Sequence, residues 1–182
     1  MRDLWPEEIG PIPDLKAPVT ILREQASLLG KKTNNLVEAE VVQLEPKISE
    51  KIEFNYVFLI VAPALDNYRY KLFTISYGIN LYPLAIDVDR DIRAEILPDA
   101  REREDQIRKR ESLVAQLGTE SAIDWEEIVD RRRLVAESED EFVEILKKIF
   151  SAKKTKRVIG ALLSMISYGQ EGQITGLNSN NQ

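Results

Sequence analysis

The sequence predicts an α+β fold with an N-terminal helix, a four-stranded antiparallel meander and a C-terminal helix pair. Apolar residues recur at helical spacing in 18–32, and then at every second position in several runs between 36 and 88. The links between these runs are too short to hold the crossover helix that a parallel pair of strands requires. A capping box that starts at Ser138 then marks the beginning of a second helical region.

A chain of 182 residues is long enough to form one domain with a substantial core. We divide it into an extended proline-rich arm (1–17), the first helix with the sheet (18–98), a charged helical excursion (99–135), a C-terminal helix hairpin of the same domain (136–167) and a flexible tail (168–182).

The arm is defined by its prolines, because four of the eight in the chain lie within the first eighteen residues. This density excludes a helix and favours an extended chain. The apolar side chains between the prolines need a surface to cover, either on their own domain or on a neighbouring subunit or partner protein. The candidate contact residues are Leu4, Trp5, Ile9 and Ile12.

The helix at 18–32 begins with a proline, which suits a first turn, and we expect it to cover one face of the sheet. The second predicted strand becomes apolar on both faces, which is typical of an internal strand. Pro83 lies within the last predicted strand and indicates a sheet edge. The four strands are predicted at 36–44, 52–62, 68–77 and 82–88.

The excursion carries ten charged side chains in the thirteen residues 99–111, which predicts a solvated helix. The capping box precedes an amphipathic helix, and another helix follows from about Thr155. From Tyr168 onward the sequence is rich in Gly, Asn and Gln, as is typical of a frayed tail.

Composition excludes several classes of chemistry, because the chain contains no histidine and no cysteine. Catalytic triads based on histidine, zinc clusters, redox dithiols and disulfides all need one of these residues. We therefore expect no cofactor. The net charge of −6 argues against a grip of the whole surface on nucleic acid. The first residues lack the apolar run of a secretory signal, so we expect a cytoplasmic protein without a membrane contact.

A basic cluster stands out in this acidic chain. Part of it falls at the predicted start of the last helix, where the helix dipole disfavours cations. It could bind phosphate, nucleic acid or an acidic partner, or pair with nearby carboxylates of the same chain. Its members are Lys147, Lys148, Lys153, Lys154, Lys156 and Arg157.

A second set of candidates is acidic. Asp87 and Asp89 would share one face of a strand, where they could hold Mg²⁺ with a further carboxylate or simply protect a sheet edge. A metal-dependent nuclease that uses only Asp, Glu and Lys would be compatible with this composition. Its further candidates are Glu24, Glu38, Glu40, Lys47 and Lys51.

The sequence favours a non-catalytic binding or regulatory module that acts through protein contacts, including self-association. The arm near Trp5 and a sheet edge at Pro83 are its expected contact surfaces. A nucleic-acid or phosphate binder that uses the basic cluster is the first alternative, and a Mg²⁺-dependent nuclease is the second.

Overall fold

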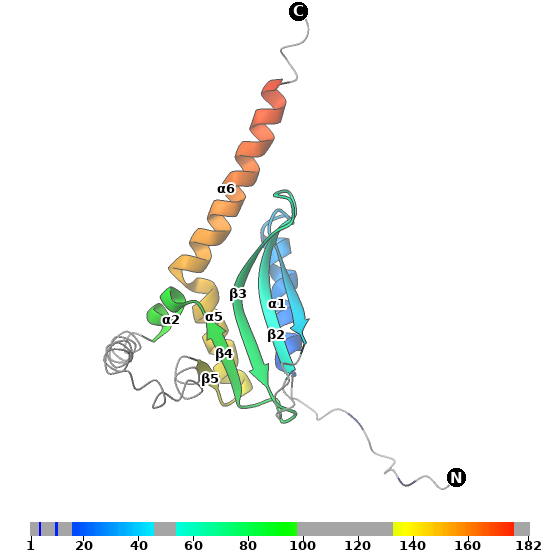
Figure 1. Cartoon of the computed structure of the whole chain (residues 1–182), viewed down its shortest axis with the longest axis vertical. Coiled ribbons are helices and arrows are strands. Elements are labelled where there is room, and N and C mark those ends of the chain that lie inside the picture. The colour runs from blue at the N-terminus through cyan, green and yellow to red at the C-terminus, as the bar shows by residue number, and fades with distance from the viewer. Residues whose placement is uncertain (1–3, 5–9, 11–15, 46–53, 98–132, 177–182) are drawn as a thin grey trace, which may run out of the picture.

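The computed structural model describes residues 4, 10, 16–45, 54–97 and 133–176, and of 169–176 it describes the backbone alone. These residues form an N-terminal helix, an antiparallel sheet and C-terminal helices, which confirms the predicted α+β class (Figure 1). In chain order the elements are α1 (Pro18–Lys32), β1 (Glu38–Leu44), β2 (Phe54–Ala62), β3 (Tyr68–Tyr77), β4 (Leu84–Val88), α2 (Arg90–Ile96), β5 (Leu134–Ala136), α5 (Glu139–Ser151) and α6 (Lys153–Gly176).

The sheet has five strands rather than four, in the order β1-β2-β3-β4-β5, and every neighbouring pair is antiparallel. The added strand, β5, spans the boundary between the expected helical excursion (99–135) and the expected helix hairpin (136–167). The sequence did not predict β5 because three residues are too few to show an alternation of apolar and polar side chains. Its pairing partners, such as Ile86 opposite Leu134, also lie far away in the sequence. The remainder of the predicted excursion, 99–132, lies outside the described residues.

The expected sheet edge at Pro83 is wrong. Strand β4 begins one residue after Pro83 and lies between β3 and β5, so the proline stands outside the hydrogen-bonded ladder. The true edges of the described sheet are β1, with seven residues, and β5, with three. The prediction that the second strand is internal is confirmed, because β2 pairs with both β1 and β3.

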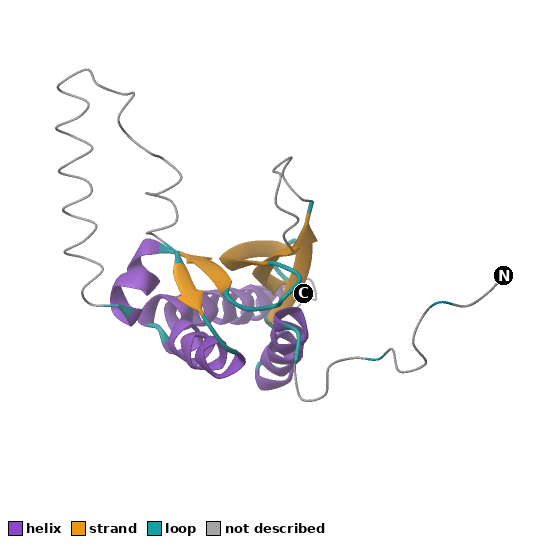
Figure 2. Ribbon diagram, turned by 90° about the horizontal axis from the view of Figure 1, so that it is seen from below, coloured by secondary structure: helices purple, strands orange, loops and turns teal. Residues whose placement is uncertain are grey.

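The helices α1 and α5 lie on one face of the sheet (Figure 2). This face holds the core, in which Phe58 and Phe73 stack with ring centroids 5.1 Å apart and Phe150 of α5 packs against both rings. Burial of these rings and of Phe142, Leu146 and Ile149 of α5 fixes the helix on the sheet. The other face carries no described helix, and we call it the open face.

The predicted helix start at Ser138 is confirmed, but only one half of the capping box forms, because Oε2 of Glu141 accepts a hydrogen bond from the backbone N–H of Glu137 rather than from that of Ser138. The hydroxyl of Ser138 accepts a hydrogen bond of 3.3 Å from the backbone N–H of Glu141. Acceptors of this kind satisfy N–H groups that have no partner within the helix.

Helices α5 and α6 are separated by Ala152 alone, and α6 runs on past the sheet instead of folding back along α5 as a hairpin would (Figure 1). The buried hydroxyl of Thr155 donates a 2.7 Å hydrogen bond to the carbonyl oxygen of Ile149, which lies in the last turn of α5. This bond satisfies a carbonyl group at the C-terminal end of the helix. Helix α6 continues to Gly176, well into the segment that was expected to be a tail. None of the described helices is both long enough and apolar enough to span a lipid bilayer.

Candidate functional site

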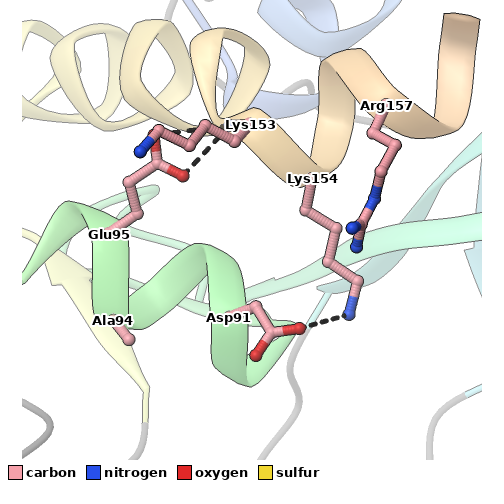
Figure 3. Close-up of a pocket in the computed structure, with 6 residues that line it drawn as sticks. All are labelled: Asp91, Ala94, Glu95, Lys153, Lys154 and Arg157. Carbon is pink, nitrogen blue, oxygen red and sulfur yellow. Dashed lines mark hydrogen bonds and ion pairs between the residues drawn. The ribbon is translucent and has the colours of Figure 1, made fainter.

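The basic cluster meets two acidic residues in a hollow of about 430 Å³ between α2 and the start of α6 (Figure 3). We call this site the α2–α6 hollow. It is lined by Asp91, Ala94, Glu95, Lys153, Lys154 and Arg157. Here residues of the predicted basic cluster lie next to carboxylates from a distant part of the sequence.

Helix α2 positions the acidic wall of the hollow, although hydrophobic periodicity does not predict this short helix. It begins because Asp89 is an N-cap: its Oδ1 atom accepts a 2.9 Å hydrogen bond from the backbone N–H of Asp91. The sequence signal that could have predicted this helix is Asp89 itself, an N-cap residue directly before the short amphipathic run at 90–96. This role replaces the strand position that Asp89 was expected to share with Asp87.

Lys154 reaches from α6 to the start of α2. Its Nζ atom lies 2.6 Å from Oδ1 of Asp89 and 3.1 Å from Oδ2 of Asp91. The side chains of Lys154 and Asp89 are only 23% and 35% exposed, so water screens this pair less than a fully exposed one. The hydrogen bond to Asp89 is the main reason that the pKa of Lys154 is raised above its usual value.

Asp89 shows the opposite shift. Burial alone would raise its pKa, but the hydrogen bonds from Lys154 and from the Asp91 backbone, with the charges of Lys154 and Arg93, together lower it. Both members of the pair are therefore held in their charged forms.

A carboxylate of the same chain binds the start of α6. The backbone N–H of Lys153 donates to both carboxylate oxygens of Glu95, at 3.0 and 3.3 Å. A carboxylate at this position compensates the positive end of the helix dipole, where an external anion would otherwise bind. The unfavourable placement of cations at the start of α6 is thus offset inside the protein by Glu95, Asp89 and Asp91.

The other basic residues lie outside these pairs. Lys147 bonds to Glu144 on its own helix at 2.6 Å, in an exposed pair. In Figure 3, Arg157 extends beside the hollow with no dashed line to the acidic residues. Among the described residues, Lys148, Lys156 and Arg157 are exposed and form no ion pair within 4.0 Å.

The acidic candidates for a nuclease site do not converge. Glu24 lies on the outer surface of α1 and pairs with Lys16. Glu40 lies on the opposite side of the molecule, on the open face of the sheet, and pairs with Arg69. Asp87 pairs with Lys71. In the part of the chain that the structure describes, no three acidic residues form a group that could hold a metal ion. Lys47 and Lys51 lie outside that part.

The open face and the edge at β1 form a second candidate contact surface. The sequence predicted contact surfaces at the arm and at Pro83 instead. Residues paired across a sheet share a face, so Val42 opposite Val57 and Leu44 opposite Asn55 point to the same side. Val42 and Leu44 are 38% and 40% exposed there. On the opposite edge, Val135 of β5 is 46% exposed on this same face, to which its partner Ala85 also points.

Ion pairs cover the middle of the open face. Arg69 of β3 reaches across β2 to Glu40 of β1, at 3.3 Å, and Val61 of β2 is buried although no described helix lies over it. Long charged side chains commonly cover apolar surface in this way. On this face, the large apolar side chains that are exposed among the described residues, Val42, Leu44 and Val135, lie at the two edges.

The arm residues can be placed only in part. Leu4 is 84% exposed, so it does not pack on the described domain. Trp5, Ile9 and Ile12 lie outside the described residues.

The chain matches no model of a protein family, no curated protein and no solved structure.

Proposed function

We propose that the chain is a non-catalytic intracellular binding module that acts through protein contacts, with the β1 edge as its contact surface. The observation that carries this proposal is the edge itself: seven residues of strand whose outer backbone groups face no strand of the described sheet, next to exposed Val42 and Leu44. An unpaired strand edge is a template for a strand from another chain.

The features of β1 support a binding role over a merely exposed edge. Proteins commonly protect such edges with charged side chains, especially lysine, with proline, with a bulge or with a very short strand. Of these features, β1 has only the charged side chains of Glu38 and Glu40. The residues Glu38–Leu44 include no lysine and no proline, and their register with β2 is continuous. The acidic side chain of Glu40 is paired with Arg69, which reduces its power to repel a partner.

Site-specific photo-cross-linking inside the cells that make the protein tests this proposal. A photoreactive residue at position 42 should yield adducts with protein, identified by mass spectrometry. The same residue at Ser164, an exposed position on α6, should yield none. Equal labelling at both positions, or no protein adduct at position 42, would contradict the proposal.

A second candidate function is binding of a polyanion such as nucleic acid by the basic cluster. It is supported by the exposed side chains of Lys148, Lys156 and Arg157, which have no ion pair among the described residues. It is weakened by the carboxylates that already compensate Lys154 and the start of α6.

A further inference from the structure

We infer that the occupant of the β1 edge is the β1 edge of a second copy of this chain, joined antiparallel about a two-fold axis at Val41. This inference rests on the proposed protein-binding function and specifies its partner. The two five-stranded sheets would then form one continuous sheet across the interface.

The sequence of β1 is complementary to itself in this register. With Val41 opposite Val41, Glu40 faces Val42 of the other copy and Glu38 faces Leu44. These four side chains all lie on the open face, because their partners on β2 do. On the core face, Ala39 meets Gln43. No carboxylate therefore lies directly opposite another, an arrangement that would be unfavourable.

Charge opposes this dimer only weakly, although the chain is acidic overall. The closest carboxylates would be the two Glu40 side chains, which are diagonal neighbours about 7–8 Å apart in this register. Glu40 is compensated by Arg69 within its own copy. The two Glu38 side chains would be six residues apart along the strand direction, which is about 20 Å at the usual rise of a strand. This separation exceeds the Debye length of about 8 Å at physiological ionic strength, so their repulsion is largely screened.

The other edge is a poorer site for the same contact. β5 offers only three residues, so it can form few backbone hydrogen bonds with another strand. Pairing through a seven-residue strand is itself a small interface. We therefore expect a dimer that dissociates on dilution, as interfaces below about 1,200 Å² commonly do.

Disulfide trapping tests the contact and its register, because the chain has no cysteine of its own. Residues opposite each other in antiparallel strands have Cα atoms about 4.5 or 5.5 Å apart, within the range that a disulfide spans. Val41→Cys should form a covalent dimer under mild oxidation, and Val135→Cys on the other edge should not. Since Val135 is well exposed, random collision would favour the control.

Two further measurements protect the test against misfolding of a single variant. A mixture of Ala39→Cys and Gln43→Cys chains should give mostly the mixed disulfide, because these residues face each other in this register only. Sedimentation of the unmodified chain over a dilution series should show a reversible monomer–dimer equilibrium.

Charge substitutions give a final check on register. Val42→Glu places a carboxylate opposite Glu40 twice in each dimer and should raise the dissociation constant about tenfold. Val42→Lys places an ammonium there and should weaken the dimer less.

The inference is overturned if the unmodified chain stays monomeric at every concentration, or if the Val135→Cys control cross-links as readily as Val41→Cys. Photo-adducts at position 42 that contain only other proteins would also overturn it, while leaving the proposed protein-binding function standing. The absence of any protein adduct would instead remove both.

Discussion

The Nζ atom of Lys154 lies 2.6 Å from Oδ1 of Asp89, and this pair joins two residues that are 65 positions apart in the sequence. Asp89 at the same time caps α2, so one carboxylate starts one helix and anchors another. A residue from the basic cluster and a residue from the acidic candidates thus satisfy each other. This pairing leaves a smaller part of the basic cluster available to bind an external anion.

Replacing Asp89 with Asn should lower the free energy of unfolding by about 1 kcal/mol, since the amide can still cap α2 but the change removes a partly buried ion pair and the negative charge at the start of the helix. Chemical denaturation measures this loss. Asp87→Asn is the matched control, because Asp87 and its partner Lys71 are mostly exposed at 3.7 Å, and its effect should be close to zero. Equal losses in both variants would contradict the role assigned to Asp89.

The same aspartate should make stability depend on acid pH. Its pKa is lowered in the folded protein, so the stabilisation is fully present above the unfolded value of about 3.9 and is lost as the pH falls through the folded pKa. Asp89→Asn should therefore unfold with a shallower dependence on pH in this acid range than the unmodified chain. Parallel curves would show that the lowered pKa contributes nothing to folding.

Tyr82→Phe should leave stability unchanged or raise it by up to about 1 kcal/mol. The buried Tyr82 hydroxyl has no hydrogen-bond partner among the described residues, so removing it relieves a desolvation cost. Tyr77→Phe is the matched control and should destabilise, because the Tyr77 hydroxyl interacts with the side chain of Tyr56 and the backbone of Val19. Thermal unfolding of the two variants distinguishes the sites.

Both tyrosines also predict a loss of stability at alkaline pH. Burial is the main cause that raises the pKa of Tyr77 and of Tyr82 to about 12. Because the unfolded residues ionise near pH 10, stability is retained below that value and declines as the pH rises toward 12. The decline should be smaller in Tyr82→Phe. An unchanged pH profile in that variant would contradict the assignment.

Lys154→Ser and the double variant Lys156→Ser with Arg157→Ser should affect different properties of the protein. The double variant should reduce retention on heparin, because both side chains are exposed and without an ion pair among the described residues. Lys154→Ser should chiefly reduce stability, since its charge is already used within the fold. Greater loss of heparin retention in Lys154→Ser than in the double variant would refute this division of roles.

Glu95→Gln should destabilise by about 0.3–1 kcal/mol, because it removes a negative charge from the start of α6 while leaving a hydrogen-bond acceptor. The loss should shrink as salt is added, which a series of denaturation curves can measure. Glu144→Gln serves as the control for an exposed carboxylate in a local pair. A loss that does not respond to salt would show that Glu95 acts without its charge.

The sequence by itself determined the main elements of this protein. Pro18 with helical spacing predicted α1, alternation predicted β1 to β4, and Ser138 predicted the start of α5, because each of these signals lies within a few adjacent residues. The absence of histidine and cysteine likewise set the available chemistry.

Only the tertiary structure decided which strands form the edges and which charges are already paired. β5 joins the sheet through partners distant in the sequence, and this contact moves one edge from the strand after Pro83 to β5, while β1 stays the other edge. The bonds of Lys154 to Asp89 and of Glu95 to α6 also join distant positions. Periodicity reports which face of an element is buried, but not which element covers it, so these pairings follow from the packing of the whole chain.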